Sequence, residues 1–574
     1  MPEKQKPLDH WKDQIKKGIR YRSVFGKSKD WRRFKNYYRG TFYQKNQIYV
    51  NIMYSYARAM IPQIYFRNPR VLVTGMKPGL TMQARVVERI DNQLIRELGL
   101  KEQMKSMALD SFLCGRGPGI IGYDTEYGYK PEFASDEFED SSLTSFNKKG
   151  ERIEYNYNVK PGMPWFIRCN PEDFIVPWGT QRWNEAQWFA FRKMRPIKDI
   201  IEDPKYPSAG KKGLKGVYTS NLVRPEQTPQ ADREIQKFQE TEDMNWVELW
   251  QIHDQRSGRV FVLSLDHDKF LRNDFDYLQM EGLPARVLGF NEDPDFFWWT
   301  PDAKYIEPQQ LEINDIRTMA AKHRRAGLIK ILYDKGVLGK DELSKLLDPD
   351  VKAAVAVDSG QHMDIRKAVT LFQSHVPPDL YASARETRED MREIIGFSRN
   401  QLGAFEAPGG RRTAHEAEIV RAASQIRVDE RRDTMADMLS SVVRAWNQLI
   451  FANWSTEKVI DVIGQDGARH WVRFTGKQIK GEFEFKVSPE ESIPENKMTQ
   501  KTEAEKFMEL AAKIPGMNMQ YLLESYASHF DWIDPKQLFP RPGKGNSPEQ
   551  PIGFQEFAGM GQGGPGASRF PGLV

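Results

Sequence analysis

A mixed α+β fold divided into several domains is predicted for this chain by three observations. Three long, well-bounded helices dominate residues 308–454. Residues 115–260 are rich in segments that read as β-strands. At 574 residues the chain is also too long for one hydrophobic core, because domains commonly hold about 100–150 residues. We therefore expect several domains, organised around the three helices.

The first helix is predicted over residues 308–326. Pro308 suits the first turn of a helix, and Gly327 suits the left-handed residue that follows a helix end. Between them several residues recur at helical spacing: Leu311, Ile316, Met319, Ala320 and His323. A compact insert follows, with strands at 328–333 and 351–357 around a short helix at 340–347.

The second and third helices complete this region. The second is predicted to begin after Pro377-Pro378 and to stop at Gly396. The third is predicted over 414–453 and opens with a capping box formed by Thr413 and Glu416. Its length would be about 60 Å at roughly 1.5 Å per residue. Because that exceeds the diameter of a small domain, we expect it to cross between layers or to lie against neighbouring subunits.

Shorter elements are predicted on both sides of these helices. Residues 46–113 are expected to be helical apart from a loop at 68–79. Strands are expected at 119–129, 164–176, 187–193, 246–254, 259–265, 458–461, 468–475 and 481–487. Two further helices are expected at 499–514 and 517–530. Residues 541–574 contain nine Gly and five Pro and are expected to be a disordered tail.

Composition is typical of a soluble globular protein, with 39% hydrophobic and 28% charged residues. The formal net charge of +5 is too small for a dedicated polyanion binder. Two cysteines, Cys114 and Cys169, provide no disulfide framework and suit a reducing cytosol. The N-terminus lacks a signal-peptide apolar region, and no run of 18 apolar residues predicts a membrane span.

Residues 1–45 are basic, with 14 Lys and Arg against four Asp and Glu, and aromatic residues are interleaved. One interpretation is a basic N-terminal arm that contacts nucleic acid or an acidic protein. The alternative is a partly helical segment that packs its aromatic residues on the body of the protein and leaves its lysines in solvent. The sequence leaves both open.

No enzymatic motif is recognisable. Gly117–Gly122 fits G-x-G-x-x-G, but a dinucleotide-binding site needs a strand before the glycines and a helix after them. Here the order is reversed, which predicts a glycine-rich turn into a strand. Gly476-Lys477 does not belong to a phosphate-binding loop, and the nine histidines lack metal-ligand spacing. We therefore predict no enzyme activity, no cofactor and no metal.

Charge chemistry is most informative between Arg385 and Arg432, where ten Arg and nine Asp or Glu occur without a Lys. Arginine is the preferred cation for planar, bidentate ion pairs at interfaces. This balance favours helices that pack against copies of themselves through six residues: Arg385, Glu386, Arg388, Glu389, Arg392 and Glu393. Ion pairs within a solvated helix would explain part of the pattern, but they would not explain the absence of Lys.

The order of helix, small β/α insert, return helix, Gly-rich loop and very long helix resembles the portal protein of tailed bacteriophages, the head-to-tail connector. Short segments are also similar to that family: 67–71, 171–174 and 413–416. The resemblance implies a portal fold that forms a ring oligomer. Its parts would be an N-terminal arm (1–45), a wing (46–307), stem helices (308–326 and 376–397), a clip (327–375), a tunnel loop (398–412), a long wing helix with closing strands (413–490), a helical crown (491–540) and a tail (541–574).

The same resemblance implies a function without catalysis. A ring, commonly of 12 subunits in that family, would occupy one capsid vertex of the virion after assembly in the cytoplasm of the bacterial host. Double-stranded DNA would pass through it without sequence-specific contacts during packaging and ejection. The other partners would be the large terminase subunit, a tail adaptor protein, and capsid and scaffolding proteins, with no membrane.

The channel residues that the resemblance implies lie in two places. The tunnel loop would contribute Arg399, Asn400, Gly403, Gly409, Gly410, Arg411 and Arg412. Its glycines would make it mobile, and its arginines would touch phosphates without reading bases. The first stem helix would contribute Lys322, Arg324 and Arg325. Near balance of Arg and acid along the helices suits a channel in which DNA must slide, since each neutralised phosphate strengthens binding.

Two other functions stay open from the sequence. A DNA-processing enzyme of the nuclease type would need carboxylates that converge on one pocket, whereas the acids here are spread along helices. A different structural minor head protein would lack both the insert and the Gly-rich loop between long helices.

Overall fold

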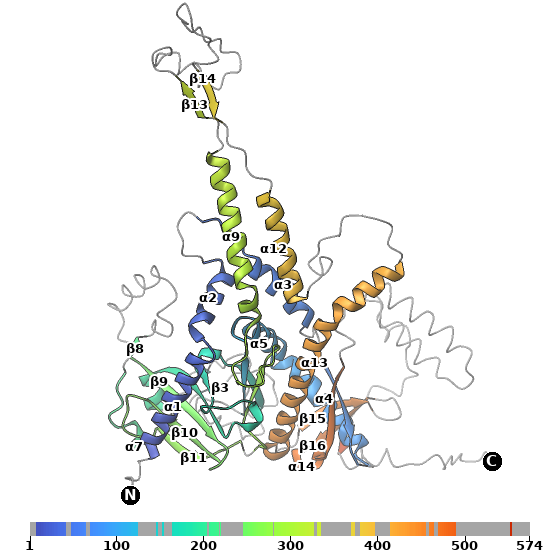
Figure 1. Ribbon diagram of the computed structural model, residues 1–574. Coiled ribbons are helices and arrows are strands. Elements are labelled where there is room, and N and C mark those ends of the chain that lie inside the picture. Colours follow the sequence, from blue (N-terminus) through green and yellow to red (C-terminus); the bar gives the residue numbers. More distant parts are fainter. Residues whose placement is uncertain are drawn as a thin grey trace, which may run out of the picture. The chain divides into compact units, whose positions relative to one another are not determined.

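The chain has a mixed α+β fold in a computed structural model (Figure 1). The structure describes residues 7–41, 47–64, 69–77, 79–123, 145–146, 152–153, 163–203, 206–216, 218–219, 245–278, 280–326, 330–333, 369–372, 379–396, 414–454, 458–463, 469–488 and 552–553. It divides into two compact units. Unit 1 comprises Met1–Arg32, Arg58–Pro301 and Ile419–Val574, and unit 2 comprises Arg33–Ala57 and Asp302–Glu418.

The largest sheet of unit 1 is antiparallel and runs in the order β11-β10-β9-β7-β6, with β8 beside β9. Its strands are β6 (Phe174–Ile175), β7 (Trp188–Pro196), β8 (Tyr218–Thr219), β9 (Asn245–Asp254), β10 (Arg259–Leu263) and β11 (Arg272–Phe275). Side chains alternate between its faces along each strand. One face buries Val247, Leu249, Val260 and Val262 against Ile200 of α6 (Ile197–Glu202).

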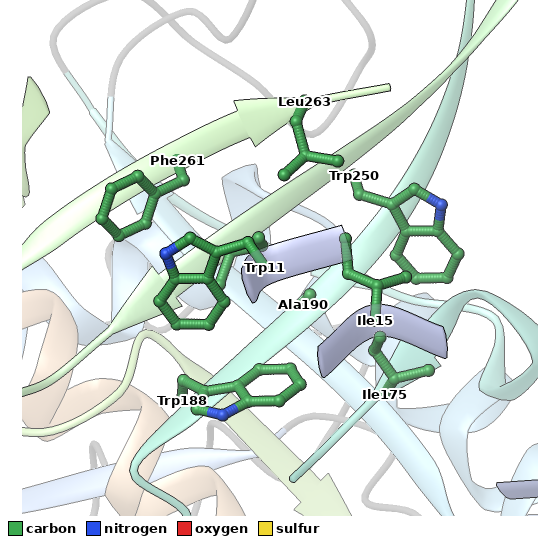
Figure 2. Packing of buried hydrophobic residues seen from close by; sticks show 9 residues of the cluster. Trp11, Ile15, Ile175, Trp188, Ala190, Trp250, Phe261 and Leu263 are labelled. Atoms are coloured by element: carbon green, nitrogen blue, oxygen red, sulfur yellow. The ribbon is translucent and has the colours of Figure 1, made fainter. Parts of the chain in front are cut away.

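Helix α1 (Pro7–Val24) covers the opposite face of this sheet, as Figure 2 shows. Trp11 and Ile15 lie one helical turn apart and pack against Trp188, Trp250 and Phe261. The Trp11 ring meets the Trp188 ring edge-on at 5.6 Å between centroids. Burial of such large apolar side chains is the main force that holds a helix on a sheet.

The N-terminal segment therefore packs on the protein instead of forming a separate arm over its described residues 7–41. Helix α2 (Ser28–Arg39) follows α1, and Trp31 is 1% exposed and lies against Trp298 at 5.3 Å. Aromatic residues spaced three to four apart place one face of each helix in the core, and the lysines occupy the other faces. The packed interpretation of the aromatics is thus confirmed for these residues.

A three-stranded sheet, β12-β2-β5, forms a second layer of unit 1, with α4 (Thr81–Glu97) and α5 (Leu100–Cys114) nearby. Its strands are β2 (Gly117–Tyr123), β5 (Pro164–Arg168) and β12 (Ala285–Leu288). The strand predicted at the Gly117–Gly122 motif is confirmed, but the turn is not in the motif: all of its residues lie in β2, and the turn falls earlier at Gly115, which ends α5 with φ +81°. A Cβ at Gly119 would lie 2.2 Å from the Phe166 ring, so the glycines allow aromatic packing and not phosphate binding.

The predicted loop at 68–79 is wrong over β1 (Arg70–Gly75), which pairs antiparallel with β17 (Phe483–Ser488). Val71 and Val73 are buried and alternate with more exposed residues, but six residues give only a weak strand signal. The hairpin of β15 (Lys458–Ile463) and β16 (Arg469–Phe474) confirms the strands predicted there. Parallel to β16 runs β18 (Ile552–Gly553), inside the stretch predicted as a disordered tail.

The remaining short elements described in unit 1 are β3 (Ser145–Phe146), β4 (Arg152–Ile153), α7 (Ser208–Lys211), α14 (Gly476–Ile479) and two 3-10 helices, η1 (Pro171–Asp173) and η2 (Trp183–Glu185). Helix α3 (Ile52–Ile64) contains Pro62 and crosses the boundary between the units. Helix α13 (Ala414–Asn453) has 40 residues and confirms the predicted third helix. Its C-terminal half buries Met435, Leu439 and Trp446. The predicted helices 499–514 and 517–530 and the cap residue Thr413 lie outside the described residues.

Unit 2 is built on two neighbouring helices, α9 (Asp302–Ala326) and α12 (Asp379–Ile395) (Figure 1). The second helix is confirmed, and Gly396 follows it with φ +79°. Between them, β13 (Lys330–Tyr333) pairs antiparallel with β14 (Val369–Phe372). The predicted helix 340–347 and strand 351–357 lie outside the described residues, so β14 is a strand that the sequence pattern did not reveal.

The predicted start of the first helix at Pro308 is wrong, because α9 begins at Asp302. Ala303 and Ile306 are fully buried, so the earlier turn is held by packing. Pro308 is exposed inside the helix, where its ring interrupts one backbone hydrogen bond without breaking the helix.

Candidate functional site

The α9–α12 helix pair of unit 2 carries most of the described residues to which a function was assigned. Within this pair, α9 carries three buried polar side chains: Gln310, Asn314 and Thr318. They recur every four residues and therefore form one stripe along the helix. Sequence reasoning missed these three residues, since polar residues at this spacing usually face solvent.

The stripe binds the backbone of the extended segment that precedes α3. Thr318 Oγ1 accepts the Ile48 N–H at 2.8 Å, and Asn314 Oδ1 accepts the Val50 N–H at 3.0 Å. Gln310 accepts the Ile52 N–H at 3.0 Å and donates to the Val50 carbonyl at 2.7 Å. A chain without regular structure thereby has its backbone groups satisfied by one helix face, as burial requires.

An ion pair fixes the beginning of α9. The carboxylate of Glu307 is 8% exposed and accepts two hydrogen bonds from the Arg33 guanidinium, a bidentate arrangement. Lys304 adds a contact of 3.0 Å from the preceding turn. Two cations on one nearly buried carboxylate thus add to the packing of Ala303 and Ile306 that holds the helix turn before Pro308.

The face that α9 buries differs from the predicted one. Ile306, Ile313, Ile316 and Ala320 lie in the core, whereas Leu311 is 42% and Met319 44% exposed. His323 is exposed as well. Helical spacing alone cannot distinguish a buried apolar stripe from an exposed one on the same helix. The predicted set of recurring residues therefore combined residues from both faces. Leu311 and Met319 leave apolar area on the outer face of the helix.

Three predicted channel residues, Lys322, Arg324 and Arg325, lie together in the last turns of α9, and all are exposed. Positive side chains at a helix C-terminus also interact favourably with the helix dipole. Their position supplies a compact cationic end to the helix. They are able to meet phosphate groups, but nothing in the surrounding contacts makes them specific for a ligand.

The six predicted subunit-contact residues all lie on α12, on the sides away from its buried stripe of Thr387, Met391 and Ile395. Four are exposed, namely Arg385, Glu386, Arg388 and Glu393, and two are half-buried, namely Glu389 and Arg392.

Tyr56 of α3 lies near one end of this set, where the positive charges of Arg392 and Arg388 act on its hydroxyl. The Arg392 Nε itself donates to the Arg388 carbonyl at 3.1 Å. Burial raises the pKa of Tyr56, and the positive charges of Arg392 and Arg388 oppose that rise. The phenol therefore stays neutral at neutral pH.

The predicted tunnel-loop residues Arg399, Asn400, Gly403, Gly409, Gly410, Arg411 and Arg412 lie outside the described residues. In the part of the chain that the structure describes, no three His, Cys, Asp or Glu side chains gather as metal ligands would. None of the helices in that same part has the length and apolar character that crossing a membrane requires.

Comparison with known proteins gives one family match and one weaker similarity. The family model described as Phage P22-like portal protein matches residues 362–550, a stretch that contains α12, α13 and β14 to β17. The chain is also 21% identical over 213 residues to the sodium/potassium-transporting ATPase subunit alpha of Drosophila melanogaster. That stretch covers 36% of this chain and 18% of the ATPase subunit, which is too little to carry a functional conclusion.

Proposed function

We propose, from the P22-like phage portal family to which residues 362–550 assign this chain, that the protein forms a ring at one vertex of a phage capsid. Portal proteins are structural, so we propose no catalytic residue. Double-stranded DNA would pass through the ring during packaging and ejection. The family match is the observation that carries this proposal.

The architecture of unit 2 also supports the proposal. A helix (α9), an insert with the β13–β14 pair, and a return helix (α12) follow one another along the chain. Of these elements, α9 and β13 precede the stretch that the family model matches and so support the proposal independently of it. We assign α9 and α12 to the stem, 327–375 to the clip and 398–412 to the tunnel loop. Residues 46–307 and α13 with its closing strands would form the wing, and 491–540 the crown.

Partners follow from these assignments. The large terminase subunit would dock on the clip during packaging, and a tail adaptor protein would replace it later. Capsid and scaffolding proteins would contact the wing. DNA would be met by Lys322, Arg324 and Arg325 and by the arginines of the tunnel loop, through phosphates only.

Electron microscopy of the purified full-length protein tests the ring directly. We expect closed rings with a central hole wide enough for duplex DNA, because one repeated head-to-tail contact closes a ring when its rotation divides the circle. The family resemblance implies 12 subunits in each ring. A protein that stays monomeric or dimeric at micromolar concentration, without rings, would contradict the proposal. Sedimentation velocity in the same buffer provides the control for grid artefacts.

A further inference from the structure

The charged residues of α12 are sorted by sign around the helix. A helix turns by about 100° per residue, which places Arg385, Arg388 and Arg392 within an arc of about 60°. We call these three residues the Arg edge. The acidic residues fall in a separate arc of about 100° by the same rotation, and we call them the acidic edge: Asp379, Glu386, Glu389, Asp390 and Glu393.

Both edges are accessible in the folded chain. Arg385 and Arg388 are exposed, and so are Asp379, Glu386, Asp390 and Glu393. The stripe of Thr387, Met391 and Ile395 is buried and separates the edges on the inner side of the helix. The Arg392 Nε donates to the Arg388 carbonyl at 3.1 Å, which partly orders one end of the Arg edge and reduces the entropy that a contact there would cost.

A sorted helix of this kind fits a second copy of the same chain better than it fits DNA. A ring is built from heterologous contacts, in which two different surfaces of one subunit meet, each on a different neighbour. Opposite charges on two sides of one helix supply such a complementary pair. A DNA-binding face would instead suffer from carboxylates within about 10 Å, the diameter of the helix itself, which repel phosphates.

We propose that the Arg edge of α12 in one subunit contacts the acidic edge of α12 in the next subunit around the ring. This contact deepens the proposed function and rests on it, since it presupposes a ring. The contact would set the direction in which subunits follow one another, because two Arg edges or two acidic edges repel each other.

Charge reversal tests the pairing. The Arg-edge variant, Arg385→Glu with Arg388→Glu, carries acid on both sides of α12, and the acidic-edge variant, Glu386→Arg with Asp390→Arg, carries cations on both sides. We expect each alone to need more than about tenfold more protein for half-assembly, because like charges meet at every contact. The control, Lys101→Glu with Lys105→Glu on exposed positions of α5, should assemble as the wild type does.

Two rescue experiments separate a lost contact from a misfolded chain. The chain with all four reversals has complementary edges again and should regain rings. An equimolar mixture of the two single-edge variants should also form rings, with the two kinds of subunit in alternation. Sedimentation velocity and electron microscopy measure both, and circular dichroism checks that helix content is unchanged.

The outcomes discriminate clearly. Single-edge variants that assemble at wild-type concentration, or a four-residue swap and a mixture that both stay unassembled, would overturn the pairing. Normal rings of the Arg-edge variant that retain less DNA would place that edge toward DNA and overturn it too. A wild-type protein without rings would instead overturn the proposed function on which the pairing rests.

Discussion

Asp91 shows what a single residue contributes inside unit 1. It lies on α4 and is fully buried, and the Asn447 amide of α13 donates to its two carboxylate oxygens at 3.0 and 2.9 Å. Burial raises the pKa of Asp91 well above its ordinary value, and nearby Glu88 adds to that rise. Within the described residues the Asn447 Oδ1 has no hydrogen-bond partner, and a protonated Asp91 is able to donate to it.

This raised pKa makes the stability of unit 1 depend on pH. The folded chain binds a proton at Asp91 that the unfolded chain releases above about pH 3.9. The free energy of unfolding is therefore greatest below that pH and falls as pH rises toward the folded pKa. The same direction would appear in any measurement of unfolding that includes α4 and α13.

Asp91→Asn should stabilise the protein at neutral pH, since the amide is neutral and pairs with both polar atoms of Asn447. We expect the apparent melting temperature at pH 7 to rise by about 2 °C or more, and the gain to shrink as pH falls toward 4. Thermal unfolding across that pH range measures it. Glu102→Gln, the same charge change at an exposed position, should show no such trend. A lower melting temperature for Asp91→Asn at pH 7 would contradict the assignment.

At the scale of elements, α9 serves two surfaces at once. Its polar stripe of Gln310, Asn314 and Thr318 binds the segment 47–53, while its outer face leaves Leu311 and Met319 exposed. Buried donors and acceptors along one stripe define a single register for the bound segment, since a slip would leave backbone N–H groups unsatisfied.

Asn314→Leu removes the acceptor of the Val50 N–H while keeping similar volume. We expect a loss of about 1–3 kcal/mol in the free energy of unfolding of unit 2, because a buried N–H is left without a partner. Hydrogen exchange at the amides of residues 48–53 should also become faster. Glu312→Ala on the exposed face of the same helix should change stability by less than about 0.5 kcal/mol. Unchanged exchange in Asn314→Leu would show that the stripe does not hold the segment.

At the scale of the whole molecule, the proposed function depends on contacts between copies and on the loop at 398–412. The two roles are separable, since the residues proposed to contact the next subunit lie on α12 and the loop follows it. A glycine-rich sequence offers little apolar surface to bury, so it suits a collar around moving DNA better than a subunit interface.

Deletion of residues 403–410 should leave rings intact and impair retention or packaging of DNA. Electron microscopy reports assembly, and a packaging assay with capsids reports DNA. A Gly–Ser replacement of equal length serves as the control, because it keeps the reach of the loop and removes its side chains. Loss of ring assembly in the deletion variant would show that the tunnel-loop assignment is wrong.

The sequence predicted the helices best where local chemistry bounds them. Gly396 ends α12 and no Gly or Pro interrupts α13, so the helix ends follow from residues within a few positions. The start of α9 was predicted less well, because packing of Ala303 and Ile306 outweighed the proline signal at 308. The residues of the tunnel loop stay a prediction.

By itself, the sequence determined the extent of α13, the end of α12 and the charge chemistry of α12, since these depend on residues that are near one another in the chain. Only the tertiary structure decided that β1 pairs with β17, that α1 covers a sheet, and which face of α9 is buried. Strand pairing and helix rotation depend on partners far away in the sequence, and no local pattern records them. The buried stripe of α12 likewise decides which sides of the helix are accessible, and so which of its two charged edges another molecule is able to contact.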